Sequence, residues 1–167
     1  MSADAIFGQL LDLDAAVAWR EEQRAAGRRV VFTNGCFDVL HAGHVDFLAW
    51  ARAQGGALVV GLNDDDSVTR LKGSHRPIVP FAQRARILTA LRSVDVVVGF
   101  SQRTPEAILE RIRPDVHTKS AQYREDELPE RAVVLQHGGE IRLAPHQAGS
   151  STTQTIARII ARYADPE

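Results

Sequence analysis

Short apolar runs alternate along the chain with longer segments whose apolar residues recur at helical spacing. Runs of this kind, bounded by glycine or polar residues, predict strands that are buried on both faces. Five are found, at residues 29–33, 57–62, 94–99, 114–118 and 139–143. Helical periodicity is found at residues 10–26, 41–54, 81–91, 104–112, 127–137 and 151–162, with a shorter helix following the polar turn at 63–66. This alternation predicts an α/β fold with a doubly wound, five-stranded parallel sheet and helices on both faces.

In a Rossmann-like sheet of this kind, ligands bind beyond the carboxyl ends of the strands, where the strand order reverses. The segments that follow the strands are therefore the candidates for a site, at residues 34–44, 63–66, 119–123 and 144–153. Residues 1–28 are expected to form an N-terminal helical extension, and residues 29–167 the domain that carries the site. The stretch 72–77 has the composition of a mobile loop.

Composition excludes several classes of protein. A formal net charge of −1 gives no basic surface for nucleic acid and no polybasic arm for a membrane. The N-terminus lacks the cationic start and apolar stretch of a signal peptide, and no apolar run approaches the roughly 20 residues that span a bilayer. The single cysteine, Cys36, fits a reducing compartment. We therefore expect a cytoplasmic protein without nucleic-acid or membrane partners.

Two residue types are scarce in a way that draws attention to their positions. Lysine is found only at Lys72 and Lys119, although arginine is abundant, and asparagine only at Asn34 and Asn63. A guanidinium is planar and forked, whereas an ammonium is a compact point charge, so a site that needs the latter cannot exchange them freely. All four residues lie in or beside segments that are candidates on other grounds.

The segment from Thr33 to His44, which reads TNGCFDVLHAGH, carries the strongest indication of chemistry. A tight turn at Gly35 would let backbone approach a ligand closely. His41 and His44 share one face of a helix, and Gly43 between them leaves a floor without a side chain. Two imidazoles at a positive helix N-terminus favour a polyphosphate. A metal pair would need a third ligand, and none is evident nearby.

This pattern resembles the HxGH signature of the cytidylyltransferase-like nucleotidyltransferase superfamily. Within that superfamily it is similar to the D-glycero-beta-D-manno-heptose 1-phosphate adenylyltransferases. The resemblance extends from about Val30 to the C-terminus and takes in further motifs in matching order, at residues 61–64, 71–73, 76–77, 83–84 and 151–153. It implies a form without the sugar-kinase domain that is sometimes fused to this activity.

The resemblance implies transfer of AMP from ATP to a sugar phosphate, with D-glycero-D-manno-heptose 1-phosphate the leading acceptor, giving an ADP-sugar and pyrophosphate. It assigns catalytic roles on the phosphates to His41, His44, Lys72 and Arg84. Nucleotide binding falls to Thr33, Asn34, Gly35, Phe37, Gly43, Asn63, Asp64, Ser151, Thr152 and Thr153. Acceptor binding falls to Asp38, Arg76, Lys119 and Tyr123. Mg²⁺ would accompany the triphosphate without a predicted protein ligand, and the family suggests a homodimer or higher assembly.

General chemistry agrees with these roles. Phosphoryl-type transfer asks a protein mainly for positioning and electrostatic stabilisation, because the acceptor's own phosphate oxygen is the nucleophile. Consistently, the sequence has no GxSxG, Walker A or HExxH motif. Asp38 is as well explained by a structural turn as by catalysis. Cys36 is interpreted as a small hydrophobe, and His75, His117, His137 and His146 as background.

One stretch departs from the family pattern. The heptose enzymes have Lys-Gly-Gly-Asp-Tyr where this chain has Lys119-Ser-Ala-Gln-Tyr123. Two glycines gain side chains and a carboxylate becomes an amide, which bears on the acceptor and the base. A cytidylyltransferase acting on glycerol 3-phosphate or a related polyol phosphate is therefore an alternative. A nucleotide-binding regulator without catalysis is a second.

Overall fold

The computed structural model describes residues 7–145 and 151–164 of the 167-residue chain. The strands are β1 (Gln9–Leu11), β2 (Arg29–Gly35), β3 (Gly56–Asn63), β4 (Val96–Phe100), β5 (Val116–Lys119) and β6 (Glu140–Leu143). The α-helices are α1 (Leu13–Ala25), α2 (Ala42–Ala53), α3 (Asp65–Lys72), α4 (Phe81–Thr89), α5 (Glu106–Ile112), α6 (Arg131–Gln136) and α7 (Thr152–Tyr163). A 3₁₀ turn, η2 (Glu125–Glu127), precedes α6.

The described strands form one parallel sheet in the order β1-β4-β3-β2-β5-β6. The α/β class with a parallel sheet is therefore confirmed, but the sheet has six strands and the prediction of five was wrong. The missed strand is β1, which pairs Gln9–Leu11 with Val96–Val98. Leu10 falls at helical spacing with Leu13, so the apolar pattern did not show that a strand ends and a helix begins between them. Asp12 sets that boundary, because its carboxylate accepts a hydrogen bond from the backbone N–H of Ala15 and caps α1.

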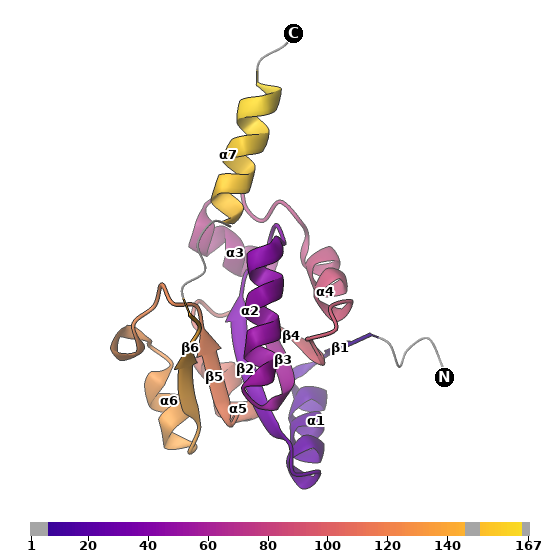
Figure 1. The fold of residues 1–167 in the computed structure, drawn as a ribbon, viewed down its shortest axis with the longest axis vertical. Coiled ribbons are helices and arrows are strands. Elements are labelled where there is room, and N and C mark those ends of the chain that lie inside the picture. The colour runs from indigo at the N-terminus through magenta and orange to yellow at the C-terminus, as the bar shows by residue number, and fades with distance from the viewer. Residues whose placement is uncertain (1–6, 146–150, 165–167) are drawn as a thin grey trace.

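Two apolar layers hold helices against the two faces of the sheet (Figure 1). One layer joins the sheet to α2 and α4 through buried residues such as Leu48, Ala85 and Leu88. The other joins it to α1, α5 and α6 through Ala16, Leu109 and Val134 among others. Because the two central strands β2 and β3 are covered on both faces, their sequences are almost continuously apolar.

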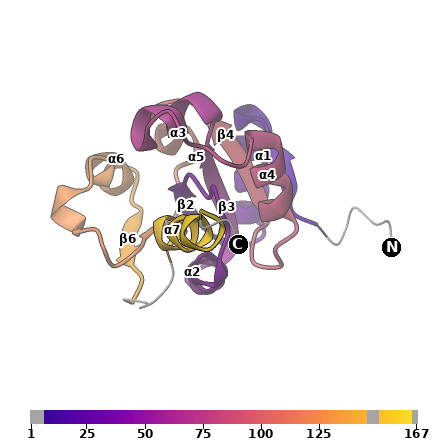
Figure 2. The ribbon, with the colours of Figure 1, turned by 90° about the horizontal axis from the view of Figure 1, so that it is seen from above.

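The strand order reverses between β2 and β5. From β2 the chain builds outward through β3 and β4, and it then returns to place β5 and β6 on the other side of β2. Loops that leave the carboxyl ends of β2 and β5 therefore diverge and leave a crevice between them. Helix α7 begins beyond this end of the sheet and extends away from it, and Figure 2 shows it end-on over β2 and β3.

Candidate active site

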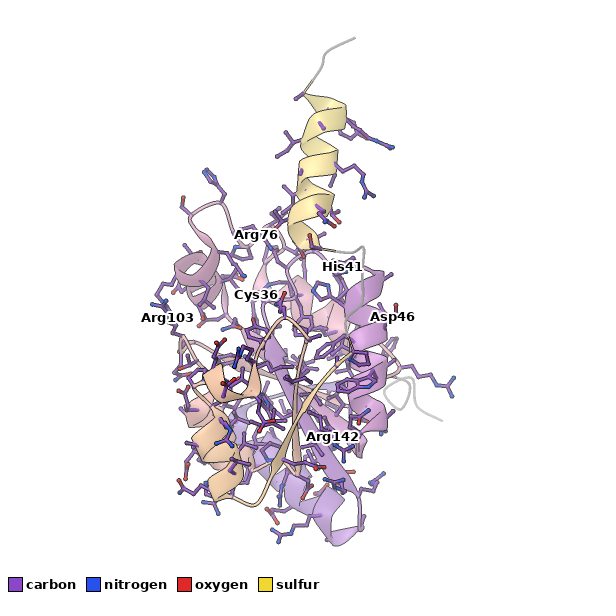
Figure 3. All side chains as sticks on the ribbon, turned by 60° about the vertical axis from the view of Figure 1, so that its left-hand side comes forward. Cys36, His41, Asp46, Arg76, Arg103 and Arg142 are labelled. Atoms are coloured by element: carbon purple, nitrogen blue, oxygen red, sulfur yellow. The ribbon has the colours of Figure 1, made fainter. Side chains whose placement is uncertain are left out.

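A cavity of about 1020 Å³ lies at the carboxyl ends of β2 and β5. Its walls come from the loop after β2, the first turns of α2, the end of α3, the segment between β5 and α6, and the start of α7. Figure 3 shows Cys36, His41 and Arg76 near the start of α7. Every residue with a predicted role lines this cavity except Arg84 and Asp64.

The predicted turn at Asn34 and Gly35 is instead the end of β2, where the two residues pair with Gly61 and Leu62 of β3. A side chain at Gly35 would nevertheless be crowded. A Cβ on Gly35 would lie 3.0 Å from the ring of Phe37, which packs over it. Phe37 itself has a φ of 44°, so the chain turns sharply at this residue to leave the sheet.

His41 and His44 form a stacked pair at the start of α2, with ring centroids 3.8 Å apart. His41 is the N-cap residue, and its backbone N–H donates to Nδ1 of His44 over 3.4 Å. With Nδ1 accepting, the neutral His44 ring carries its proton on Nε2. Burial and the neighbouring imidazole lower the pKa of His44 to about 4, and burial lowers the pKa of His41. Both rings are therefore neutral hydrogen-bond donors at pH 7.

Asp38 lies in the cavity wall and binds the loop before α4. Its carboxylate accepts hydrogen bonds from the backbone N–H groups of Ile78 and Val79 and pairs with the guanidinium of Arg76. Burial acts to raise the pKa of Asp38, but these donors outweigh it and hold the pKa below its ordinary value. The structural reading of Asp38 accounts for all these contacts, and Arg76 reaches the cavity already paired.

Arg84 does not reach the cavity. Its side chain is fully buried, and its guanidinium donates to the backbone carbonyls of Cys36, Asn63 and Val79 and to the carboxylate of Asp65. All three of its nitrogen atoms are therefore engaged within the protein. Helix α4 therefore places Arg84 beneath the loops that form the cavity wall, and its contact with phosphate stays a prediction.

The end of β3 supplies one cavity residue and one cap. Asn63 lines the cavity, and its amide donates to Ser67 over 2.9 Å. Asp64 instead caps α3 by accepting from the backbone N–H of Ser67. Its side chain faces the helix end and does not line the cavity, so its contact with the nucleotide stays a prediction.

Lys72 and the start of α7 face the cavity from two further sides. Lys72 is the last residue of α3 and is exposed. Ser151 caps α7 by accepting from the backbone N–H of Gln154, and the hydroxyl of Thr152 donates to the carbonyl of Val39. This second bond ties the helix start to the loop that leads to the histidine pair. Thr153 also lines the cavity.

The four residues predicted to bind the acceptor all line the cavity. Lys119 and Tyr123 both line the cavity, and the Lys119 ammonium lies 5.3 Å from the centre of the Tyr123 ring. Sequence reasoning missed Arg103, which lines the cavity from the loop after β4 (Figure 3). It also missed Glu130, because a lone glutamate before a helix gives no signal. His117, interpreted as background, contacts that glutamate beneath the cavity.

The described residues contain no cluster of three or more His, Cys, Asp or Glu suited to holding a metal ion. Of the carboxylates that line the cavity, Asp38 and Glu130 are already paired with cations. Burial also raises the pKa of the Cys36 thiol, which favours its protonated form at neutral pH. Among the described helices, none is long and apolar enough to cross a membrane.

Comparisons with known proteins agree with this architecture. A family model described as cytidylyltransferase-like matches residues 32–157. The bifunctional protein HldE of Halorhodospira halophila is 48% identical over 96% of this chain, and that of Magnetococcus marinus is 51% identical over 83%. The chain spans 34% and 28% of those two proteins, about a third of their length.

Two solved structures share the fold. A lipopolysaccharide core biosynthesis protein from Thermoplasma volcanium superposes with a TM-score of 0.61 at 25% identity, covering 72% of this chain and all of the other. A pantoate-beta-alanine ligase from Francisella tularensis, in complex with an ATP compound and beta-alanine, gives a TM-score of 0.59 at 13% identity over 96% of this chain and 80% of its own. Because the family model covers most of the chain and the curated relatives are close to half identical, this chain belongs to the cytidylyltransferase-like family.

Proposed function

We propose that this protein is an adenylyltransferase that transfers AMP from ATP to D-glycero-D-manno-heptose 1-phosphate, releasing pyrophosphate. One observation carries the proposal: the histidine pair, Lys72 and the start of α7 converge on the same cavity as Lys119. The cavity volume is at the upper end of the range for small-molecule sites, which suits two substrates side by side. The heptose acceptor is supported by the relatives named HldE, whose matches cover 96% and 83% of this chain.

The reaction needs no nucleophile from the protein. A phosphate oxygen of the acceptor attacks the α-phosphorus of ATP, a new P–O bond forms, and the bond to the oxygen bridging the α- and β-phosphorus atoms breaks. Pyrophosphate leaves with the electron pair of that bond. Because the attacking oxygen is already anionic, the protein does not have to remove a proton from it. Its task is to align the two phosphates and stabilise the charge that develops between them.

The residues in the cavity suit that task. The Nε2–H of His44 and the positive end of α2 are donors for the α- and β-phosphates, and they gain strength where water is excluded. Lys72 supplies a mobile point charge from the loop side for the departing pyrophosphate. Ser151 to Thr153 offer hydroxyls and backbone N–H groups at a second helix start. Mg²⁺ is proposed to enter with the triphosphate, held by phosphate oxygens and water, since the described residues contain no cluster of three or more metal-ligating side chains.

The test measures pyrophosphate release in the presence of Mg²⁺ for every pair of nucleotide and acceptor. The nucleotides are ATP, CTP, GTP and UTP, and the acceptors are heptose 1-phosphate, other sugar 1-phosphates and glycerol 3-phosphate. We expect the highest kcat/KM for ATP with heptose 1-phosphate. A clear preference for CTP and glycerol 3-phosphate would replace this function with that of a polyol-phosphate cytidylyltransferase. Binding of ATP without turnover of any pair would leave a nucleotide-binding regulator.

A further inference from the structure

A buried carboxylate, that of Glu130, lies beside Lys119 in the cavity wall, and the proposed transfer reaction gives it no role. Glu130 is 1% exposed, and its Oε1 accepts from both Nε2 of His117, at 3.0 Å, and Nζ of Lys119, at 2.8 Å. His117 is wholly buried and stacks on Phe32 with ring centroids 5.7 Å apart. A charged group this deep in the protein is costly unless it is well paired.

The sequence builds this arrangement from two elements. His117 and Lys119 are two residues apart on β5, so their side chains leave the sheet on the same face. Glu130 is the residue before α6, which packs on that face. Burial opposes ionisation of Glu130, but the His117 hydrogen bond and the Lys119 ammonium outweigh it and lower its pKa to about 2. The carboxylate is therefore charged throughout the physiological range.

The ammonium of Lys119 is held between two groups. Glu130 binds it from the buried side, and the ring of Tyr123 lies 5.3 Å from it. A free lysine carries a point charge on a flexible four-carbon stem, so its position is normally ill defined. Here the side chain is only 10% exposed and still lines the cavity. An ammonium has three donors, so one bond to Glu130 leaves others for a ligand.

We propose that Glu130, itself oriented by His117, is a positioning residue that fixes the Lys119 ammonium as a donor to the phosphate of the acceptor. The inference rests on the proposed function and deepens it, because it assigns the acceptor phosphate to the β5–α6 side of the cavity. It also explains how the Lys119 ammonium is held in place although Ser120-Ala121-Gln122 replaces the Gly-Gly-Asp of the heptose enzymes. The carboxylate that binds it comes from Glu130, before α6, and not from position 122.

The first test reads the position of Lys119 without any turnover. Because Lys72 and Lys119 are the only lysines, acylation with an N-hydroxysuccinimide ester and peptide mass spectrometry follows both rates in one sample. We expect Glu130→Gln to speed acylation of Lys119 about fivefold or more, while Lys72 serves as the internal reference and is unchanged. Glu125→Gln is the matched control, since Glu125 is an exposed residue of the same segment that pairs with Arg131. An unchanged Lys119 rate in Glu130→Gln would overturn the proposal.

The second test reads ligand contact. We expect D-glycero-D-manno-heptose 1-phosphate, or inorganic phosphate at higher concentration, to slow acylation of Lys119 in the unchanged protein and to lose this effect in Glu130→Gln. Protection that is equal in the two proteins, or absent from both, would overturn the proposal. Neither result depends on catalysis, so a protein that proved inactive with every substrate pair would remove the proposed function while this test still decided the inference.

Kinetics separate positioning from general damage. With an active substrate pair, we expect Glu130→Gln to raise KM for the acceptor about tenfold and to leave KM for ATP unchanged. Glu130→Asp keeps the charge and should recover part of the acceptor affinity. It also replaces Glu130→Gln if the amide variant loses its cooperative unfolding transition. A loss of kcat with both KM values unchanged would show a role other than acceptor positioning and contradict the proposal.

Discussion

The two histidines at the start of α2 bring hydrogen bonds and not positive charge to the cavity. Both have a pKa below its ordinary value, and the value for His44 is about 4. A neutral imidazole with Nδ1 already accepting can only donate through Nε2–H. At the scale of single residues, positive charge in the cavity therefore comes from lysine and arginine, at Lys72, Arg76, Arg103 and Lys119. Arg76 and Lys119 are each paired with one carboxylate, of Asp38 and Glu130 respectively.

The first prediction concerns His44 as a donor in the transition state. We expect His44→Ala to lower kcat about 100-fold or more, comparable to the loss of one preorganised donor, with the thermal unfolding transition retained. The measurement is steady-state pyrophosphate release. His75→Ala is the control, because His75 lies in an exposed loop and does not line the cavity. A near-normal rate for His44→Ala would remove this residue from the mechanism.

The second prediction follows from the same pKa. The unfolded chain protonates this imidazole as the pH falls through about 6.5, whereas the folded protein keeps it neutral down to about 4. Over that window the unfolded state binds more protons, so stability falls as the pH falls. Buried His117 contributes with the same sign. We expect His44→Asn to flatten, without abolishing, the decline in unfolding free energy between these pH values, measured by urea titration. An unchanged slope would contradict this account.

The third prediction tests whether Lys72 acts as a point charge. We expect Lys72→Arg to reduce kcat although the charge is kept, because a forked guanidinium cannot take the position of a compact ammonium. Lys72→Met should reduce it further. Both substitutions leave stability within about 0.5 kcal/mol, since Lys72 is exposed at the end of α3. Full activity of the arginine variant, measured in the same assay, would show that any cation suffices.

At the scale of elements, Arg84 of α4 ties together the loops that surround the cavity. Its guanidinium joins the carbonyl after β2, the carbonyl at the end of β3, and the loop before α4. The pair with Asp65 adds the first turn of α3. The sequence predicted Arg84 near the phosphates because the motif at residues 83–84 accompanies other motifs of the family, some of which do line the cavity. Burial of an arginine by backbone carbonyls cannot be predicted from a motif.

The fourth prediction separates these two roles. We expect Arg84→Lys to lower the free energy of unfolding by about 3 kcal/mol, because the fork that satisfies three buried carbonyls is lost. KM for ATP should change little at temperatures where the variant is folded. Arg86→Lys on the exposed side of α4 is the control, with an effect below about 0.5 kcal/mol. A stable Arg84→Lys variant with a strongly raised KM for ATP would restore the phosphate contact.

The other elements show which strands and helices can be predicted from the hydrophobic pattern alone. The predicted strands and helices are found at their approximate positions because continuous apolar runs and helical spacing reflect burial directly. The predicted helix at 127–137 is instead a 3₁₀ turn followed by α6 at Arg131–Gln136. Pro129 lies between them, and Leu128 before it has an extended backbone with ψ of 118°, as the residue before a proline prefers, which explains the break. Glu130 follows this proline and directly precedes α6. The position of its carboxylate therefore depends on where α6 begins, which the hydrophobic pattern did not predict.

For the whole molecule, the strand order explains why residues far apart in sequence share one cavity. The reversal between β2 and β5 opens the crevice, and the α7 start closes it from above through the Thr152–Val39 hydrogen bond. The sequence predicted the parallel sheet and part of the cavity lining, because both depend on patterns within a few residues, but it missed the cavity-lining residues at 103–105 and 127–130. It could not predict the edge strand β1, which is three residues long and exists only through its pairing with β4.

The most direct test of the central claim is the identity of the product formed from ATP, Mg²⁺ and D-glycero-D-manno-heptose 1-phosphate. Mass spectrometry of the reaction mixture should show an ADP-heptose and an equal amount of pyrophosphate, because attack at the α-phosphorus joins AMP to the acceptor phosphate. Formation of ADP with a doubly phosphorylated sugar would mean attack at the γ-phosphorus, and it would contradict the account of this site as a nucleotidyltransferase.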